Sequence, residues 1–218
     1  MKIFKALEST KTDQGNTLSI IEKSIDDLPE GEILIKVHYS SLNYKDALSA
    51  SGAPGVTRNY PHTPGIDAVG IVEQSTDGKF KEGDSVIVTG YDLGMNTAGG
   101  FGEYIRVPSS WVINLPNGLT EKDSMILGTA GLTAGLSIQA LNDFNSNDGF
   151  DGSSSVVSGS TGGVGSIAVM LLSKLGSSVT AVTGKNTQKE LLEALGASEI
   201  ISREELSELS RLSLIHIS

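Results

Sequence analysis

The sequence predicts an α/β protein with a β-rich first part and a second part in which helices cover a parallel sheet. Short alternating runs of apolar residues, separated by Gly, Pro and Asp, fill the chain up to about residue 117. After residue 119 the pattern becomes strand, glycine-rich turn, helix, strand, helix, strand. This second pattern is typical of parallel strands joined by helical crossovers.

In the first part, four runs have the alternation and β-branched residues of strands. They are residues 32–39, 68–73, 85–89 and 103–107. Turn signals rich in Gly, Pro and Asp separate them, at 29–31, 77–78, 82–84 and 116–118. The sequence therefore predicts a β-rich domain over residues 1–119.

The second part begins with Thr120, which resembles a helix N-cap with Asp123 three residues later. We expect a second helix over 130–141, a polar loop over 142–153, and strands over 155–158, 178–183 and 199–202. Between these strands, apolar residues recur at the helical period after Val164 and again at Leu191, Leu192 and Leu195, where Gly196 ends the helix. The predicted dinucleotide-binding domain covers residues 120–210.

Composition narrows the possible functions. The chain of 218 residues has 26 acidic and 16 basic side chains, a formal charge of −10, which repels nucleic acids. It has no cysteine, so disulfides, thiolate metal sites and a cysteine nucleophile are excluded. The three histidines, His38, His62 and His216, lack the spacing of zinc ligands, and we expect no metal.

No stretch reaches the ~18–20 uninterrupted apolar residues of a membrane helix. The first residues also lack the apolar core of a signal peptide. We therefore expect a soluble, cytoplasmic protein without a membrane partner.

The glycine-rich turn at residues 159–165 is the strongest functional signal. Gly159, Gly162 and Gly165 follow a buried type of strand and open an amphipathic helix. Such a turn lets the backbone approach a pyrophosphate, and the helix N-terminus offers it unpaired N–H groups. The sequence predicts a pyridine-dinucleotide site here, against the alternative of a glycine turn without a ligand.

The end of the next strand indicates which dinucleotide binds. An NAD-preferring site places Asp or Glu about 20 residues after the turn. Residues 182–186 contain no carboxylate, whereas Thr183 and Lys185 would attract a 2′-phosphate. The sequence therefore favours NADPH, although Lys185 as an ordinary exposed lysine is the alternative.

Several motifs together resemble the zinc-independent medium-chain reductases of the quinone oxidoreductase type, and within these the bacterial acrylyl-CoA reductase group. The motifs are SSLNYKD at 40–46, PGID at 64–67, GTAGLTA at 128–134, the glycine turn, and LGAS at 195–198. They cover about residues 1–208 in the family's order. The resemblance implies a GroES-like β domain followed by a Rossmann domain.

The resemblance also implies site residues. For cofactor binding it implies Tyr44, Thr129, Thr133, Ser160, Thr161, Gly162, Gly163, Val164, Thr183, Gly184, Lys185 and Arg203. Tyr44 would lie against the nicotinamide end, and Thr183, Gly184 and Lys185 would hold the 2′-phosphate, where relatives often have an arginine. A lysine is a point charge in place of a planar fork, which weakens that grip.

The implied reaction is hydride transfer from NADPH to a conjugated alkene, such as an enoyl-CoA, or to a quinone. Without zinc, hydrogen bonds must polarise the substrate carbonyl, and the candidate catalytic residues are Asn43, Tyr44, Asp46 and Arg58. Structural roles remain open for each. Asn43 could cap a turn, Tyr44 could pack in the core, Asp46 could be an N-cap, and Arg58 could lie in a solvated loop.

The family's Rossmann domain continues for roughly another hundred residues, whereas residues 211–218 do not resemble that continuation. We therefore expect a C-terminally truncated sequence with an unrelated tail, whose full-length form is a homodimer. Two alternatives to the reductase remain open: a protein that binds NADP(H) without turnover, and an inactive fragment. A methyltransferase is disfavoured because the second strand lacks an acidic ribose ligand.

Overall fold

The structure, a computed structural model, describes residues 2–145 and 148–208. The chain forms two compact units, Met1–Thr129 and Ala130–Ser218, and each is described by itself. The boundary between them follows residue 129, ten residues after the one expected from sequence. The expected tail at 211–218, with His216, lies outside the described residues.

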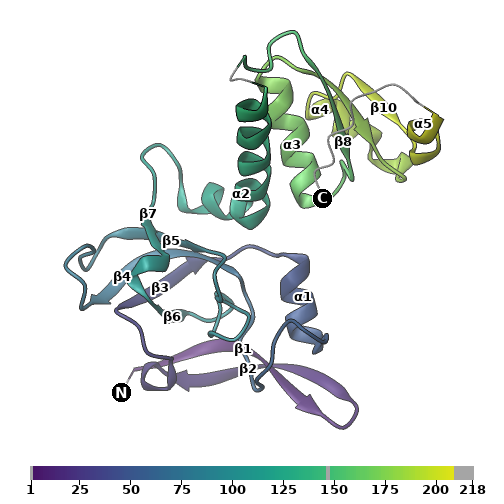
Figure 1. The fold of residues 1–218 in the computed structure, drawn as a ribbon. Helices are drawn as coiled ribbons and strands as arrows, with labels where there is room; N and C mark the ends of the chain where they lie inside the picture. Colours follow the sequence, from purple (N-terminus) through teal and green to yellow (C-terminus); the bar gives the residue numbers. More distant parts are fainter. Residues whose placement is uncertain (1, 146–147, 209–218) are drawn as a thin grey trace. The chain divides into compact units, whose positions relative to one another are not determined.

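The first unit contains two antiparallel sheets (Figure 1). One is a hairpin of β1 (Ile3–Thr12) and β2 (Gly15–Ser24). The other has five strands in the order β6-β3-β4-β5-β7. Their bounds are β3 (Ile33–Tyr39), β4 (Asp67–Ser75), β5 (Ser85–Thr89), β6 (Tyr104–Val107) and β7 (Val112–Asn114). One short helix, α1 (Tyr44–Ser51), follows β3.

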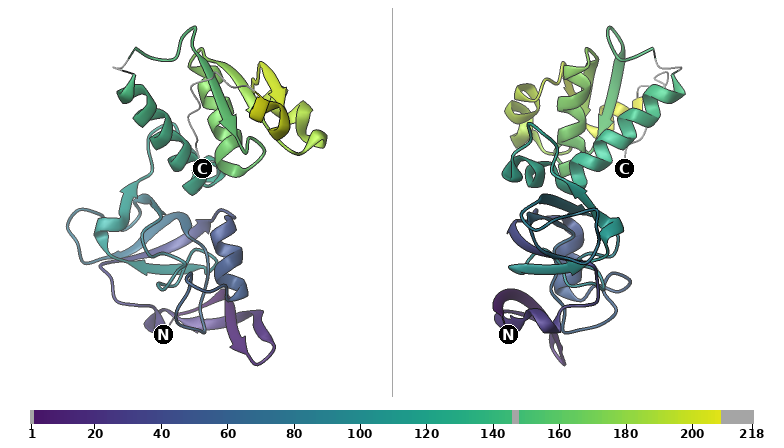
Figure 2. Two further views of the ribbon diagram at one scale, coloured as in Figure 1. Left: turned by 45° about the vertical axis from the view of Figure 1, so that its right-hand side comes forward. Right: turned by 90° about the vertical axis from the view of Figure 1, so that its left-hand side faces the viewer.

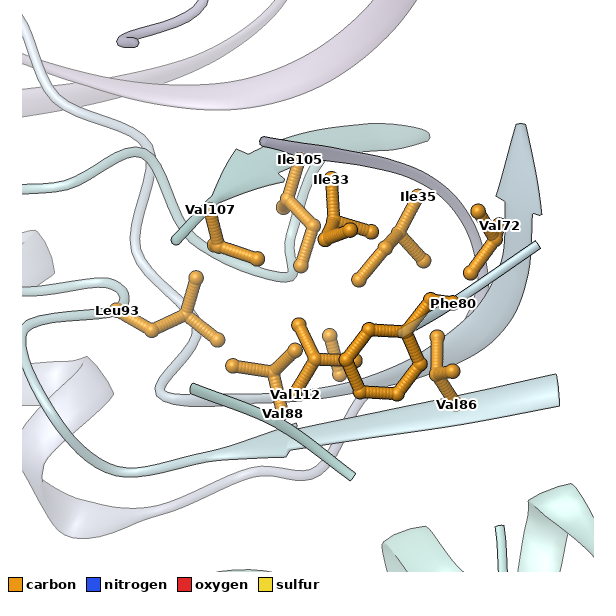
Figure 3. Close-up of a cluster of buried hydrophobic side chains, with 11 residues drawn as sticks. Ile33, Ile35, Val72, Phe80, Val86, Val88, Leu93, Ile105, Val107 and Val112 are labelled. Atoms are coloured by element: carbon orange, nitrogen blue, oxygen red, sulfur yellow. The ribbon is translucent and has the colours of Figure 1, made fainter. Parts of the chain in front are cut away.

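The core of this unit lies inside the five-stranded sheet (Figure 3). Strand β3 contributes Ile33 and Ile35, and β5 contributes Val86 and Val88, all at most 1% exposed. Phe80 packs among them from the β4–β5 connection. Within each strand these side chains recur at every second residue, which is the period of a β-strand. The sequence predicted the strands from the same period. All four predicted strands of the first part are confirmed, each within two residues at either end.

Three elements of this unit escaped prediction: the β1–β2 hairpin, α1 and β7. Strand β2 is exposed along most of both faces, so its sequence carries no alternating pattern. It is held by its pairing with β1, which extends over ten residue pairs. A hairpin that buries so few side chains shows no alternation of apolar and polar residues, because that alternation arises only where one face of a strand is covered.

His62 joins the segment before β4 to the hairpin. Its backbone N–H and carbonyl pair with those of Ser9, and its ring is 5% exposed. Burial lowers the pKa of His62 from its ordinary value of 6.5. Among the described residues, its Nε2 atom has no hydrogen-bond partner. The folded unit therefore disfavours the protonated form of this imidazole.

We expect the first unit to lose stability as the pH falls below 6.5. Unfolded His62 takes up a proton there while folded His62 resists it, so the free energy of unfolding falls by at most about 1.4 kcal/mol per pH unit. His62→Asn keeps a side-chain donor and does not titrate. Denaturant unfolding followed through Trp111 between pH 7.5 and 5 should show a smaller slope for this variant. An unchanged slope would assign the pH dependence to other groups.

Helix α2 (Glu121–Phe144) spans the end of the first unit and the start of the second. Its N-terminus is confirmed, because the Thr120 hydroxyl accepts the N–H of Asp123 at 3.1 Å. The helix is broken at Gly128, whose φ of 49° and ψ of −151° are not helical. A Cβ at this position would lie 2.7 Å from a carboxylate oxygen of Asp67, so glycine is required.

Among the described residues, α2 alone is long and apolar enough to pass a composition test for a membrane span. The break at Gly128 leaves residues 129–144 as its longest continuous run, which is 16 residues or about 24 Å. That length is shorter than the ~30 Å hydrocarbon core of a bilayer. The continuous run in α2 is therefore shorter than the membrane span that its apolar composition would allow.

The second unit has a parallel sheet in the order β10-β9-β8, with bounds β8 (Ser154–Ser158), β9 (Ser178–Val182) and β10 (Glu199–Ile201). Its further helices are α3 (Gly163–Lys174), α4 (Lys189–Ala194) and α5 (Arg203–Glu208). Helix α3 lies along β8 and β9 in all views (Figures 1 and 2). Its Ala168, Val169 and Leu172 are buried against Val157, Val179 and Ala181. The mixed α/β class and the strand–helix order predicted for this part are confirmed.

Several predicted bounds in this unit differ from the observed ones by one to three residues. The loop expected at 142–153 is helical up to Phe144, and Ser202 is not the end of a strand. Ser202 instead caps α5, since its hydroxyl accepts the N–H of Glu205 and its own N–H donates to the Glu205 carboxylate. Serine followed by glutamate three residues later is a capping signal that would have indicated this helix.

Candidate functional site

The glycine turn connects β8 to α3 as a tight loop. Gly159 has a φ of 63°, a left-handed conformation that favours glycine. A Cβ at Gly165 would lie only 2.4 Å from the carbonyl oxygen of Gly159. The backbone of the turn is therefore folded onto itself more closely than any side chain would permit.

The N-terminus of α3 has N–H groups that are available to an anionic ligand. Its N-cap is Gly162, which has no side chain to accept a hydrogen bond. The first intrahelical bond runs from the N–H of Ser166 to Gly162, so helix geometry leaves the N–H groups of Gly163, Val164 and Gly165 without intrahelical acceptors. This arrangement fits a cofactor pyrophosphate.

Ser160 has a different role from its neighbours in the turn. It is fully buried, and its hydroxyl donates to the carbonyl oxygens of Val157 at 2.6 Å and Val182 at 3.1 Å. These bonds join the ends of β8 and β9. The Ser160 side chain thus stabilises the turn from inside, where a ligand could not reach it.

The register of the parallel sheet places three predicted cofactor residues of the second unit, Thr161, Lys185 and Arg203, after neighbouring strand ends. Ser158 pairs with Val182, and Val182 pairs with Ile201, so the three strands end side by side. Thr161 follows β8, Lys185 follows β9, and Arg203 follows β10. The hydroxyl oxygens of Thr161 and Thr183 are 3.5 Å apart, and the Thr183 hydroxyl accepts the N–H of Lys185 at 3.0 Å.

Two basic side chains follow the strands at this edge. The side chains of Lys185 and Arg203 are exposed, and so is Gly184 between Thr183 and Lys185. A Cβ at Gly184 would meet nothing within 4 Å, so the space beside it is open. The chemistry of the set, two cations and two hydroxyls, fits a phosphate monoester.

In the first unit, Asn43 and Asp46 form the N-terminal cap of α1. The Asp46 carboxylate is 2% exposed and accepts the N–H groups of Asn43 at 2.8 Å and Ile66 at 2.9 Å. Burial raises the pKa of Asp46, and these backbone hydrogen bonds oppose that shift. Asn43, and not Asp46, is the N-cap of α1. Asp46 is the N3 residue of the capping box, three residues after the N-cap.

Tyr44 is the first residue of α1 and is 81% exposed. Its phenol is therefore available to a ligand, and the core-packing alternative for this residue is wrong. The side chains of Asn43 and Asp46 form hydrogen bonds within the part of the chain that the structure describes, whereas that of Tyr44 forms none there.

Asp67 is the residue that sequence reasoning did not single out for a role. It is fully buried at the start of β4. One oxygen, Oδ2, accepts the Asn43 amide at 2.9 Å and the Thr129 N–H at 2.9 Å, together with the Ser41 hydroxyl. The other oxygen accepts the Thr129 hydroxyl at 2.7 Å.

These bonds make Asp67 the centre of a network that holds the loop after β3 against the break in α2. Thr129, which the resemblance implied for cofactor binding, donates its N–H and its hydroxyl to Asp67. Thr133, on the far side of the unit boundary, accepts the Ser137 hydroxyl with its carbonyl oxygen. The sequence offers one signal for this role of Asp67. It is a charged residue directly before the apolar run that begins at Ala68.

Arg58 lies apart from Tyr44. Its backbone N–H donates to Asn96, and it lines a pocket with Gly52, the residue that ends α1. Tyr44 begins the same helix, whose eight residues span about 12 Å. The structure therefore does not bring the four predicted catalytic residues together in one place. Within residues 2–145 and 148–208, no group of three His, Asp or Glu side chains could hold a metal ion.

Comparison with known proteins agrees with these features. Residues 29–117 match the alcohol dehydrogenase GroES-like domain. The acrylyl-CoA reductase AcuI of Ruegeria pomeroyi is 41% identical over 208 residues, which is 94% of this chain and 62% of that protein. YhfP of Bacillus subtilis, provisionally named a quinone oxidoreductase, is 44% identical over 206 residues, 94% of this chain and 61% of that protein.

Two solved structures are similar over most of this chain. Escherichia coli YhdH with bound NADPH has a TM-score of 0.88 and 43% identity, covering 94% of this chain and 63% of that one. Bacillus subtilis YhfP with bound NAD has a TM-score of 0.89 and 43% identity, covering 94% and 62%. The chain thus spans about three fifths of the length of these relatives. Residues 29–117 are thus similar to the alcohol dehydrogenase GroES-like domain, and the chain over most of its length is similar to the corresponding part of these relatives.

Proposed function

We propose that this chain is the cofactor-binding part of an NADPH-dependent reductase that acts on a conjugated alkene or a quinone. The observation that supports the proposal best is the edge formed by the ends of β8, β9 and β10. It combines an uncapped helix N-terminus with Thr183, Lys185 and Arg203, the groups suited to a pyrophosphate and a 2′-phosphate. The NADPH bound by YhdH and the acrylyl-CoA reductase activity in the name of AcuI support the same assignment.

In this proposal each residue has a limited task. The N–H groups at the start of α3 bind the pyrophosphate, and Lys185 and Arg203 bind the 2′-phosphate. The bound NADPH supplies the hydride. Tyr44 is the exposed hydroxyl that can polarise the substrate carbonyl or deliver a proton. Asn43 and Asp46 act as positioning residues, because their hydrogen bonds fix the first turn of α1.

The choice of nucleotide tests the proposal. Lys185→Glu reverses the charge at the end of β9, and we expect it to weaken NADPH binding roughly ten- to a hundredfold, or about 1.4–2.8 kcal/mol. Binding of NADH, which has no 2′-phosphate, should change by less than about twofold. Both affinities can be measured by titration of nicotinamide fluorescence.

Lys174→Glu is the matched control, because it makes the same charge change at the opposite end of α3. It should leave the preference for NADPH intact. Equal affinities of the unaltered chain for NADPH and NADH would contradict the proposed phosphate site. The NAD bound by YhfP makes this comparison necessary, since close relatives hold either nucleotide.

A protein that binds NADP(H) without turnover is the second candidate. It is favoured by the structural hydrogen bonds that occupy Asn43 and Asp46. Loss of NADPH absorbance after addition of acrylyl-CoA or a small quinone would support the reductase. Binding of NADPH without oxidation by either electrophile would support the second candidate.

A further inference from the structure

A polar pocket on the first unit lies between the β1–β2 hairpin and the segment after α1. Its volume is about 510 Å³, within the range of ligand sites. The polar side chains that line it are Lys11, Asn16, Thr57, Arg58, Asn59 and Tyr60. It is distinct from the cofactor edge, which belongs to the second unit.

The pocket is positively charged in a chain whose net charge is −10. Its nine lining residues include Lys11 and Arg58 but no Asp or Glu. Neither cation forms an ion pair with any residue that the structure describes. Asn96, which accepts the Arg58 N–H, donates to the carboxylate of Asp92, and the same carboxylate accepts the Thr97 hydroxyl.

The carbonyl groups at the end of α1 could repel an anion from this pocket, but they are already satisfied. The oxygen of Leu48 accepts the Ala53 N–H at 2.9 Å, that of Ser49 accepts the Tyr60 hydroxyl at 2.7 Å, and that of Ala50 accepts the Ser9 hydroxyl at 2.8 Å. Their negative partial charges are therefore engaged within the protein.

The rim of the pocket is also held in place. Gly52 has a φ of 76°, and a Cβ there would meet the Asn16 side chain at 2.5 Å, so helix end and hairpin are in close contact. Asn16 donates to the Ser9 hydroxyl at 2.8 Å. On the other side, Asn96 accepts the Arg58 N–H at 3.1 Å. Lys11 and Arg58 thus extend from backbone that is fixed.

We infer that this pocket binds a phosphate group of a coenzyme A thioester substrate, an inference that rests on the proposed reductase function. A guanidinium fork, an ammonium group and neutral amide donors are the groups that recognise phosphate. A quinone has no anion to place there, so the pocket favours the thioester among the two proposed substrate classes.

The dimensions agree with this assignment. Tyr44 and the pocket lie at the two ends of α1, which are about 12 Å apart. The arm between the thioester and the phosphates of coenzyme A is a chain of amide and methylene units. By peptide dimensions its extended length is on the order of 15 Å. One molecule can therefore reach both ends of the helix.

The test is titration of the 218-residue chain with coenzyme A by calorimetry, with the cofactor edge saturated with NADPH. We expect Lys11→Gln combined with Arg58→Gln to weaken binding at least about tenfold. Lys81→Gln combined with Lys122→Gln removes the same charge at two exposed sites outside the pocket, and should change binding by less than about twofold. Coenzyme A binding that is equal in the two double variants, or absent from the unaltered chain, would overturn the inference.

Two further probes identify the phosphate. Dephospho-coenzyme A lacks the 3′-phosphate, and pantetheine lacks every phosphate. Weaker binding of dephospho-coenzyme A would assign the pocket to the 3′-phosphate, and undiminished binding would assign it to the pyrophosphate. Pantetheine that binds as tightly as coenzyme A would overturn the inference. Failure of the reductase proposal is seen separately, as absence of NADPH binding or oxidation.

Discussion

Replacement of Asp67 by alanine should destabilise the first unit by about 3–5 kcal/mol, because it removes the acceptor of a buried hydrogen-bond network. Four donors from Ser41, Asn43 and Thr129 converge on this carboxylate. Without it, the loop after β3 and the break in α2 lose their common partner. Denaturant unfolding followed through Trp111 measures this unit alone, since Trp111 is the only tryptophan and packs against its core.

Asp67→Asn should have a smaller effect for a geometric reason. Its amide oxygen can take the place of Oδ2, which accepts three donors, and its NH₂ group can donate to the Thr129 hydroxyl. Asp13→Ala, in the exposed β1–β2 turn, is the control and should change stability by less than about 0.5 kcal/mol. If Asp67→Ala costs no more than Asp13→Ala, the network does not stabilise the unit.

The network also shows where prediction from sequence reaches its limit. Strand β5 was predicted with its observed bounds, because its alternation and the turns on both sides are local signals. The role of Asp67 depends on Thr129, 62 residues later in the chain, and on a helix that breaks at Gly128. No local pattern contains that pairing, so only the folded backbone could connect the two positions.

The candidate site also has a part that the sequence could predict and a part that it could not. One helix and one strand, α3 and β9, separate the glycine turn from Lys185, and the sequence predicts both, so the convergence of the turn and Lys185 follows from parallel topology. Arg58 and Tyr44 are close in sequence, and both were predicted to belong to one group of catalytic residues. The chain instead runs from Tyr44 along α1 before it reaches Arg58, which lines a pocket with Gly52 at the other end of that helix.

Replacement of Gly165 by alanine should abolish most of the cofactor affinity of the second unit. The added Cβ would lie 2.4 Å from the Gly159 oxygen and 2.9 Å from the Ser160 Cα, and both are backbone atoms that cannot rotate away. The turn must open, and it carries the N–H groups of Gly163 and Val164 with it. We expect NADPH affinity to fall more than about a hundredfold, with a loss of stability of roughly 1–3 kcal/mol from overpacking.

Gly135→Ala provides the matched control in the same unit. This glycine lies inside α2, and a Cβ there would meet nothing within 4 Å. The substitution should stabilise the helix by about 0.5–1 kcal/mol and leave NADPH binding unchanged. Fluorescence titration gives the affinities, and far-ultraviolet circular dichroism gives the stabilities, because the described part of this unit has no tyrosine or tryptophan. Gly165→Ala that binds NADPH as tightly as Gly135→Ala would show that close packing of the turn is not what forms the phosphate site.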